Sequence, residues 1–340
     1  MRISIIGATG HLGHALTRQI EKLKLPVRII CRNTSNVEYF ESIGLDVVRA
    51  GLEDLESLKN ALSDSEYVIH LASKISVMPL VRKELPRINV QGTKNVIEAC
   101  EKAGVEKLIY VSSIQAISPG SGKKQIDENS EINPYLTHDD YGFSKAKATL
   151  EVLRIAKSGN LKATILCPSG IIGPYDPGSS HIGKFLKVHI KSGTHAFVSG
   201  GYDFVDVRDV SSAILNSINA GDNGQHYLLS GSKVSVKDFL KHVCLLTNKR
   251  MPTIRIPNSV ALLAGQTNGY INRIIGRDTW FTASSLRTLW GNSDISSRLA
   301  EKDLNFKSRS WKYLLVLRYP GRVNRRRYSS TCSTFTILAL

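Results

Sequence analysis

Residues 1–13 read MRISIIGATGHLG, a short apolar run followed by glycines at every third position. An apolar run that stops at a glycine and leads into apolar residues at helical spacing predicts a strand, a tight turn and a helix. In that context one glycine permits the turn, another lets the backbone approach a pyrophosphate, and a third allows close packing of helix on strand. The helix N-terminus then offers free N–H groups to phosphates. We therefore predict a dinucleotide-binding loop made by Gly7, Thr9, Gly10, His11, Leu12 and Gly13; the alternative is a turn that holds no ligand.

The rest of the first half alternates strand and helix patterns, which predicts a parallel sheet with helices on both faces. The predicted strands are Arg2–Ile6, Val27–Cys31, Asp46–Val48, Tyr67–Ala72, Lys107–Ser112 and Lys162–Cys167. The predicted helices are Leu12–Leu23, Val90–Ala103 and Asp140–Lys157. Two more strands, Phe204–Val207 and His226–Leu229, are expected to return to the main sheet.

After Pro168 the alternation weakens, and loops rich in glycine and proline lead into mixed segments. The predicted fold class is therefore α/β, a Rossmann-type doubly wound parallel sheet with a smaller C-terminal substrate lobe. We assign residues 1–169 and 203–231 to the NAD(P)-binding domain and residues 170–202 and 232–315 to the substrate lobe. Residues 316–340 form a basic tail, interpreted as disordered, with a docking segment as the alternative.

Composition narrows the classes of function. The net charge is +16, but eight basic residues and no acidic ones follow residue 306, which leaves a mildly basic body and no sign of a nucleic-acid partner. Five scattered cysteines favour reduced thiols in a cytoplasmic protein, and neither they nor the nine histidines have metal-ligand spacing. No run approaches the ~18 apolar residues of a membrane span.

The second predicted strand ends in Cys31-Arg32-Asn33. An acidic residue at this position would hold the ribose 2′-hydroxyl of NAD, whereas arginine suits the 2′-phosphate of NADP. We favour NADP with Arg32 as its ligand, keep NAD open, and note that a solvated arginine is the plain alternative.

Tyr141 and Lys145 lie four residues apart on a predicted helix and therefore share a face. A nearby ammonium favours the phenolate and lowers the pKa of a phenol. A tyrosine tuned in this way can exchange a proton with a substrate oxygen. With a dinucleotide loop in the same chain, the pair suggests hydride chemistry.

Several motifs together resemble the extended short-chain dehydrogenase/reductase family, also called the NAD-dependent epimerase/dehydratase family. They are the glycine loop, HLAS at residues 70–73, NVQGT at 89–93, VSS at 111–113, the Tyr141–Lys145 pair, PSGIIGP at 168–174 and VRDV at 207–210. The whole is similar to the dihydroflavonol-reductase-like and sterol-dehydrogenase-like branches.

The resemblance implies roles for particular residues. Tyr141 is the expected acid/base, Lys145 the residue that binds the nicotinamide ribose and lowers the pKa of Tyr141, and Ser113 the hydrogen-bond donor to a substrate carbonyl. Asn89 is expected to be structural. The remaining implied cofactor residues are Leu52, Leu71, Ala72, Ser73 and Pro168. Gly51 departs from the family pattern, which often has an acidic residue there to contact adenine.

Tyr141 and Ser113 together would polarise a carbonyl, so the expected reaction is reduction of a ketone or aldehyde, or the reverse oxidation of an alcohol. Ile114, Gln115 and Ala116 stand where dehydratases of the family carry an Asp-Glu pair, which argues against water elimination. A nucleotide-sugar epimerase remains an alternative, as does a non-catalytic NADP sensor. The expected partner is a small carbonyl or alcohol substrate, and a homodimer is a family expectation.

Overall fold

The computed structural model describes residues 2–79, 84–118, 125–177, 180–277, 279–291 and 294–313; the predicted basic tail, residues 316–340, lies outside them. Seven strands form one sheet in the order β11-β7-β5-β4-β1-β2-β3, and every neighbouring pair is parallel. They are β1 (Ile3–Ile6), β2 (Val27–Cys31), β3 (Asp46–Arg49), β4 (Tyr67–His70), β5 (Lys107–Val111), β7 (Lys162–Pro168) and β11 (His226–Leu229). All seven were predicted as strands, with ends that differ by at most two residues.

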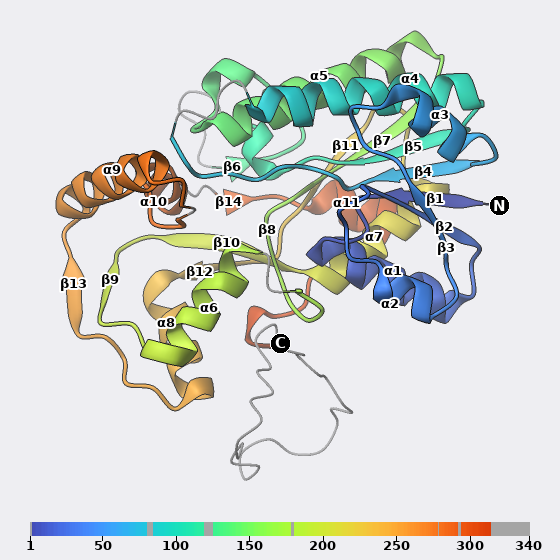
Figure 1. Ribbon diagram of the computed structural model, residues 1–340. Coiled ribbons are helices and arrows are strands. Elements are labelled where there is room, and N and C mark those ends of the chain that lie inside the picture. Colours follow the sequence, from blue (N-terminus) through green and yellow to red (C-terminus); the bar gives the residue numbers. More distant parts are fainter. Residues whose placement is uncertain are drawn as a thin grey trace.

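Helices cover both faces of this sheet (Figure 1). One face carries α3 (Leu55–Leu62), α4 (Gly92–Ala103) and α5 (Asp140–Ser158), and the other α1 (His11–Leu23), α2 (Glu38–Ser42), α7 (Val207–Ala220) and α11 (Arg298–Leu304). Each face has its own apolar core. Every residue of β1 and β5 is buried, because a parallel sheet between two helix layers has no solvent face. The predicted α/β fold is confirmed.

The strand order reverses between β1 and β4. From β1 the chain adds β2 and β3 on one side and then crosses to β4, β5, β7 and β11 on the other. The loops after β1 and β4 therefore part in opposite directions at the carboxyl ends of the strands. In open α/β sheets such a switch point opens the crevice that holds the ligand.

The C-terminal region forms a smaller lobe. One three-stranded sheet holds β8 (Gly170–Ile172), β10 (Gly201–Asp206) and β12 (Ser232–Ser235), and β9 (Ala196–Val198) pairs with β13 (Ile254–Ile256). The helices of the lobe are α6 (His181–Ser192), α8 (Val236–Thr247), α9 (Asn258–Ile274) and α10 (Ala283–Trp290). Short elements complete the chain: β6 (Gln125–Ile126) paired with β14 (Asp294–Ile295), a π-helical turn η1 (Pro86–Gln91), and the 3-10 turns η2 (Ile114–Ala116), η3 (Pro134–Leu136) and η4 (Trp311–Tyr313).

One predicted strand lies elsewhere. The segment Phe204–Val207 was expected in the main sheet, but β10 pairs with β8 and β12, and Val207 begins α7. Phe204 packs in a third core with Ile172 and Phe239, so the apolar pattern of the segment serves the smaller lobe. The expectation was wrong because periodicity reports burial and not which sheet supplies it.

Two kinds of feature are absent from the described ranges. None of their helices has the length and apolar character needed to cross a bilayer. Nor do these ranges hold a group of three or more His, Cys, Asp or Glu side chains placed to bind a metal ion.

Candidate active site

The glycine loop connects β1 to α1 as its sequence predicts. Gly7 has a φ of +93°, in the left-handed region that favours glycine. A Cβ atom on Gly7 would lie 2.5 Å from the Ala72 nitrogen, and one on Gly13 would lie 2.3 Å from the Ala8 carbonyl oxygen. At Gly10, the N-cap of α1, the nearest atom to such a Cβ is 3.7 Å away. The loop is packed on two sides and open at the helix N-terminus, so the residues present fit a pyrophosphate.

The other predicted cofactor residues gather at the same edge of the sheet, because parallel strands end there together. Leu71, Ala72 and Ser73 follow β4, Leu52 follows β3, Arg32 follows β2 and Pro168 ends β7. Leu52 packs closely on α4: a Cβ on Gly92 would lie 3.0 Å from its side chain. Thr9, His11 and Leu12 are half-buried at the turn and the start of α1. Their contacts with a cofactor stay predictions.

A second arginine supports the turn that carries Arg32. Arg49, at the end of β3, donates from Nη1 to the carbonyl oxygens of Arg32 and Ser35, both at 2.9 Å, and to the Cys31 sulfur at 3.4 Å. The Arg32 side chain itself is exposed. Sequence reasoning missed Arg49, although the parallel register that sets Cys31 opposite Arg49 was a usable signal.

The start of α1 is tied to a loop of the smaller lobe. His11 bonds through Nε2 to the Pro174 carbonyl oxygen at 3.0 Å. The Arg18 guanidinium carbon lies 4.0 Å from the Tyr39 ring centre and 4.6 Å from that of Tyr175. Tyr175 has a φ of +72°, a conformation that a tyrosine holds only when its surroundings fix it. These contacts close the phosphate loop against residues 174–175.

The three predicted catalytic residues come from two neighbouring elements. Ser113 follows β5 and is the N-cap of η2, where its Oγ accepts from the Gln115 N–H at 3.2 Å. Tyr141 and Lys145 lie on the buried face of α5. A Cβ on Gly142 would lie 2.6 Å from the Gln115 carbonyl oxygen. Glycine at this position therefore lets the start of α5 reach the turn that carries Ser113.

The environment of Tyr141 keeps its phenol protonated. Only 9% of Tyr141 is exposed, and burial raises the pKa of the phenol well above its usual value. Hydrogen bonding with the hydroxyls of Ser73 and Ser113 lowers this pKa by a smaller amount. The arrangement brings a predicted cofactor residue, Ser73, and a predicted catalytic residue, Ser113, to the same hydroxyl.

Lys145 is 1% exposed, and its ammonium has two buried acceptors. Nζ donates to the Tyr110 hydroxyl at 2.7 Å and to the Val111 carbonyl oxygen at 2.9 Å. Burial lowers the pKa of Lys145 to about 7. The spacing located Lys145 on the correct face but did not predict Tyr110, a polar residue in a fully buried strand. The expected influence of Lys145 on the pKa of Tyr141 stays a prediction.

Asn89 holds the loop after β4 against α5. Its Nδ2 donates to the Lys74 carbonyl oxygen at 3.0 Å and to Ser144 Oγ at 2.9 Å, and its Oδ1 accepts from the Lys74 N–H at 2.8 Å. The residue lies in the π-helical turn η1, where the predicted helix was expected to begin as a regular one at Val90. Such a network positions Ser73 and supports the structural role expected for Asn89.

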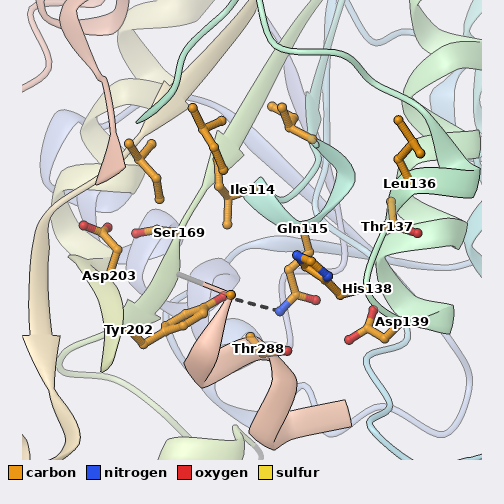
Figure 2. A pocket seen from close by; sticks show the side chains of 14 residues that line it. Ile114, Gln115, Leu136, Thr137, His138, Asp139, Ser169, Tyr202, Asp203 and Thr288 are labelled. Atoms are coloured by element: carbon orange, nitrogen blue, oxygen red, sulfur yellow. Dashed lines mark hydrogen bonds between the residues drawn. The ribbon is translucent and has the colours of Figure 1, made fainter. Parts of the chain in front are cut away.

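A pocket is lined by residues of η2, by residues 136–139 before α5 and by residues of the smaller lobe, among them Tyr202 and Thr288 (Figure 2). Five aliphatic side chains line it: Ile114, Ile117, Ile126, Leu136 and Ile295. Its polar lining includes Gln115, which donates from Nε2 to the Tyr202 hydroxyl at 3.3 Å (Figure 2). Asp139 is also in the wall, and burial raises the pKa of its carboxyl group. Among the described residues that form this lining there is no lysine or arginine.

Comparison with known proteins agrees with this geometry. A model of the NAD dependent epimerase/dehydratase family matches residues 3–230. Sterol demethylase protein B of Methylococcus capsulatus is 31% identical over 259 residues, 76% of this chain and 78% of that protein. A Synechocystis protein provisionally named dihydroflavonol 4-reductase is 28% identical over 257 residues, 74% of each chain. The crystal structure of gox2253 has 26% identity, a TM-score of 0.78, and coverage of 92% of this chain and 94% of that chain.

Proposed function

This chain belongs to the NAD dependent epimerase/dehydratase family, a family of NAD(P)-dependent oxidoreductases, and from that premise we propose that it reduces a ketone or aldehyde, or oxidises the corresponding alcohol. One observation carries the proposal: Tyr141, Ser113 and Ser73 meet at one hydroxyl, next to a glycine loop that fits a pyrophosphate. The bound cofactor would supply or accept the hydride. The residues of this chain would hold the carbonyl oxygen and manage its proton.

In the reductive direction Tyr141 gives its phenolic proton to the carbonyl oxygen, and Ser113 donates a hydrogen bond to the same oxygen. Burial raises the pKa of Tyr141, so the phenol holds its proton at neutral pH until a carbonyl oxygen is bound beside it. We assign stabilisation of the resulting phenolate to Lys145, one helical turn along the same face of α5, because its pKa of about 7 allows it to carry charge at neutral pH.

For the cofactor we propose NADP. Arg32 is exposed at the end of β2, where it can reach a 2′-phosphate, and Arg49 fixes the turn that presents it. Planar guanidinium groups suit phosphate oxygens. Gly7, Gly10 and the N-terminus of α1 would hold the pyrophosphate.

For the substrate we propose an uncharged, largely apolar carbonyl compound. The aliphatic wall of the pocket favours such a molecule, and the absence of lysine and arginine from its described lining offers no partner for the diphosphate of a nucleotide sugar. The names of the two relatives, which refer to a sterol and a dihydroflavonol, support the same class. These observations favour a reductase over the epimerase alternative.

The test measures NADPH oxidation with a panel of apolar ketones and aldehydes, for the native chain and for Tyr141→Phe. We expect the variant to lose roughly 10²–10⁴-fold in kcat, since the phenylalanine keeps the ring and removes the acid. Tyr135→Phe is the matched control, because Tyr135 is 80% exposed. Undiminished turnover by Tyr141→Phe would contradict the mechanism.

The same assay separates the alternatives. Cofactor binding without turnover of any carbonyl compound would favour the non-catalytic sensor. Interconversion of nucleotide sugars without net oxidation of NADPH would favour the epimerase.

A further inference from the structure

Helix α9 buries its smallest residues and exposes its largest. The buried residues are Ala261, Gly265 and Gly269. Leu263 is 64% exposed and Ile274 is 84% exposed. A helix on a globular protein normally buries its large apolar side chains, so this distribution requires an explanation outside the core.

The large exposed apolar residues lie on one side of the helix, around the exposed Thr267. With 3.6 residues per turn, they fall within roughly a third of the circumference of the helix, opposite the buried stripe. We define this outer face of α9 by Val260, Leu263, Tyr270, Ile271 and Ile274, each at least 50% exposed. Contiguous exposed apolar surface of this kind marks an interaction site.

The opposite side of α9 is packed firmly, so its orientation is fixed. A Cβ on Gly265 would lie 3.0 Å from the Ala283 nitrogen and 3.0 Å from Leu286 Cδ1, both in α10. Figure 1 places α9 at the outer edge of the smaller lobe, next to α10. Small residues allow this close approach, and the outer face cannot turn inward without losing it.

The segment around α9 is basic. Between Asp238 and Asp278 the sequence has no carboxylate and six cations: Lys241, Lys249, Arg250, Arg255, Arg273 and Arg277. All six side chains are exposed. Glu84 approaches Arg273 from the neighbouring loop but forms its ion pair with Lys74. Arg255 therefore precedes the N-terminus of α9 by three residues, and Arg273 and Arg277 lie at its C-terminal end.

We propose that the outer face of α9 docks on the surface of an anionic lipid bilayer. Leu263, Ile271 and Ile274 would enter the boundary between headgroups and acyl chains, and Tyr270 would lie at headgroup depth. Arg255, Arg273 and Arg277, near the ends of α9, would contact anionic headgroups. The helix would lie in the plane of the interface, because only one of its sides is exposed and apolar.

In this orientation α9 and α10 would lie between the bilayer and the pocket. Thr288 of α10 and Gly291 just after it line the pocket, while the other side of α10 supports α9. Docking would hold the protein at the surface in which an apolar substrate dissolves. This consequence rests on the proposed function, whereas docking itself does not.

The experiment is flotation of the full chain with two kinds of vesicle, phosphatidylcholine alone and phosphatidylcholine with an equal amount of phosphatidylglycerol. We expect binding to the anionic vesicles that weakens as salt is added. Leu263→Asn/Ile274→Asn should reduce binding at least about tenfold, because two side chains lose their apolar contact. Arg273→Gln/Arg277→Gln should reduce it less and weaken the salt dependence. Leu23→Asn, at a 58% exposed leucine of α1, is the control and should bind as the native chain does.

Thermal melting and NADPH binding show whether each variant is folded. A folded variant that no longer floats with vesicles has lost docking, and its turnover is measured in a separate assay. Equal binding to both vesicles would overturn the assignment of an anionic surface. Failure to bind either would overturn docking altogether. Docking on a bilayer would also be overturned if the native chain is a dimer and Leu263→Asn/Ile274→Asn converts it to a monomer. A second copy of the chain would then cover the outer face of α9.

Discussion

Helices α1 and α9 differ in where they place their large apolar residues: α1 buries them against the sheet, and α9 exposes them to solvent. In α1 the large apolar residues Leu16 and Ile20 are completely buried against the sheet. In α9 glycine faces inward, while Leu263 and Ile274 face solvent. The orientation of α1 is explained by the core it helps to form. The orientation of α9 is explained only by the shape of its contact with α10, which leaves its large residues for something outside the chain.

The largest expected effect compares a leucine from each helix. Leu16→Ala should lower the free energy of unfolding by about 2–5 kcal/mol, because it opens a cavity in a filled core. Leu263→Ala should change it by less than about 0.5 kcal/mol, since the side chain is mostly in solvent. Urea titration measures both changes in unfolding free energy, provided that the dependence of this free energy on urea concentration is the same for each variant. Equal losses would mean that the outer face of α9 is part of the folded core.

A second comparison is between Lys145, a buried lysine on α5, and Lys249, an exposed lysine of the smaller lobe. Burial lowers the pKa of Lys145 from 10.5 to about 7, so between these pH values the unfolded chain binds a proton that the folded chain does not. The contribution of Lys145 to stability therefore rises with pH from about 7 to about 10.

Lys145→Met should remove that rise, and the difference in unfolding free energy between native chain and variant should grow across this range. Lys249→Met, at an exposed lysine, is the control for the loss of one cation by the same change of side chain. A difference in unfolding free energy between the native chain and Lys145→Met that stays constant from pH 7 to pH 10 would contradict the low pKa of Lys145.

A third test concerns cofactor choice. Arg32→Ala should weaken NADPH binding by roughly tenfold or more, the effect of losing one charged hydrogen bond to phosphate. Arg49→Met should weaken it by a smaller factor, because Arg49 acts by holding the turn. Neither change should affect NADH. Arg255→Met, an arginine of the basic segment near α9, should leave both affinities unchanged in fluorescence titrations. An equal loss for NADPH and NADH would show that the arginines serve only the fold.

The smallest expected effect probes the two faces of α9 at adjacent positions. Gly265→Val should cost about 1–3 kcal/mol of stability, because the added atoms meet the backbone of α10. Ala264→Val, one residue along and exposed, should cost less than about 0.5 kcal/mol. Comparable values would mean that α9 can roll on α10.

The sheet and the loop after β1 could be predicted because each rests on a local pattern. An apolar run, a glycine and a helical repeat fix β1, the turn at Gly7 and α1 within a few residues. The same holds for the face that Tyr141 and Lys145 share, which follows from a spacing of four. Even the family resemblance depends on such short patterns at the ends of strands.

Features that depend on contacts between distant segments could not be predicted in this way. Periodicity identified Phe204 as buried but not the sheet that buries it. Spacing located Lys145 but not its acceptor Tyr110, which lies 35 residues away in the chain. The outward face of α9 was equally hidden, since its apolar pattern alone would be expected to point toward the core.

The strand order has a consequence for synthesis on the ribosome. β1 precedes the other strands in the chain yet lies in the interior of the sheet, and the strands that flank it, β2 and β4, are complete by His70. The phosphate loop can therefore assemble while most of the chain is still to come. Edge strand β11 pairs with β7 only after residues 226–229 have emerged, when β8, β9 and β10 already exist. Cotranslational folding should thus complete the nucleotide-binding crevice before the pocket beside it.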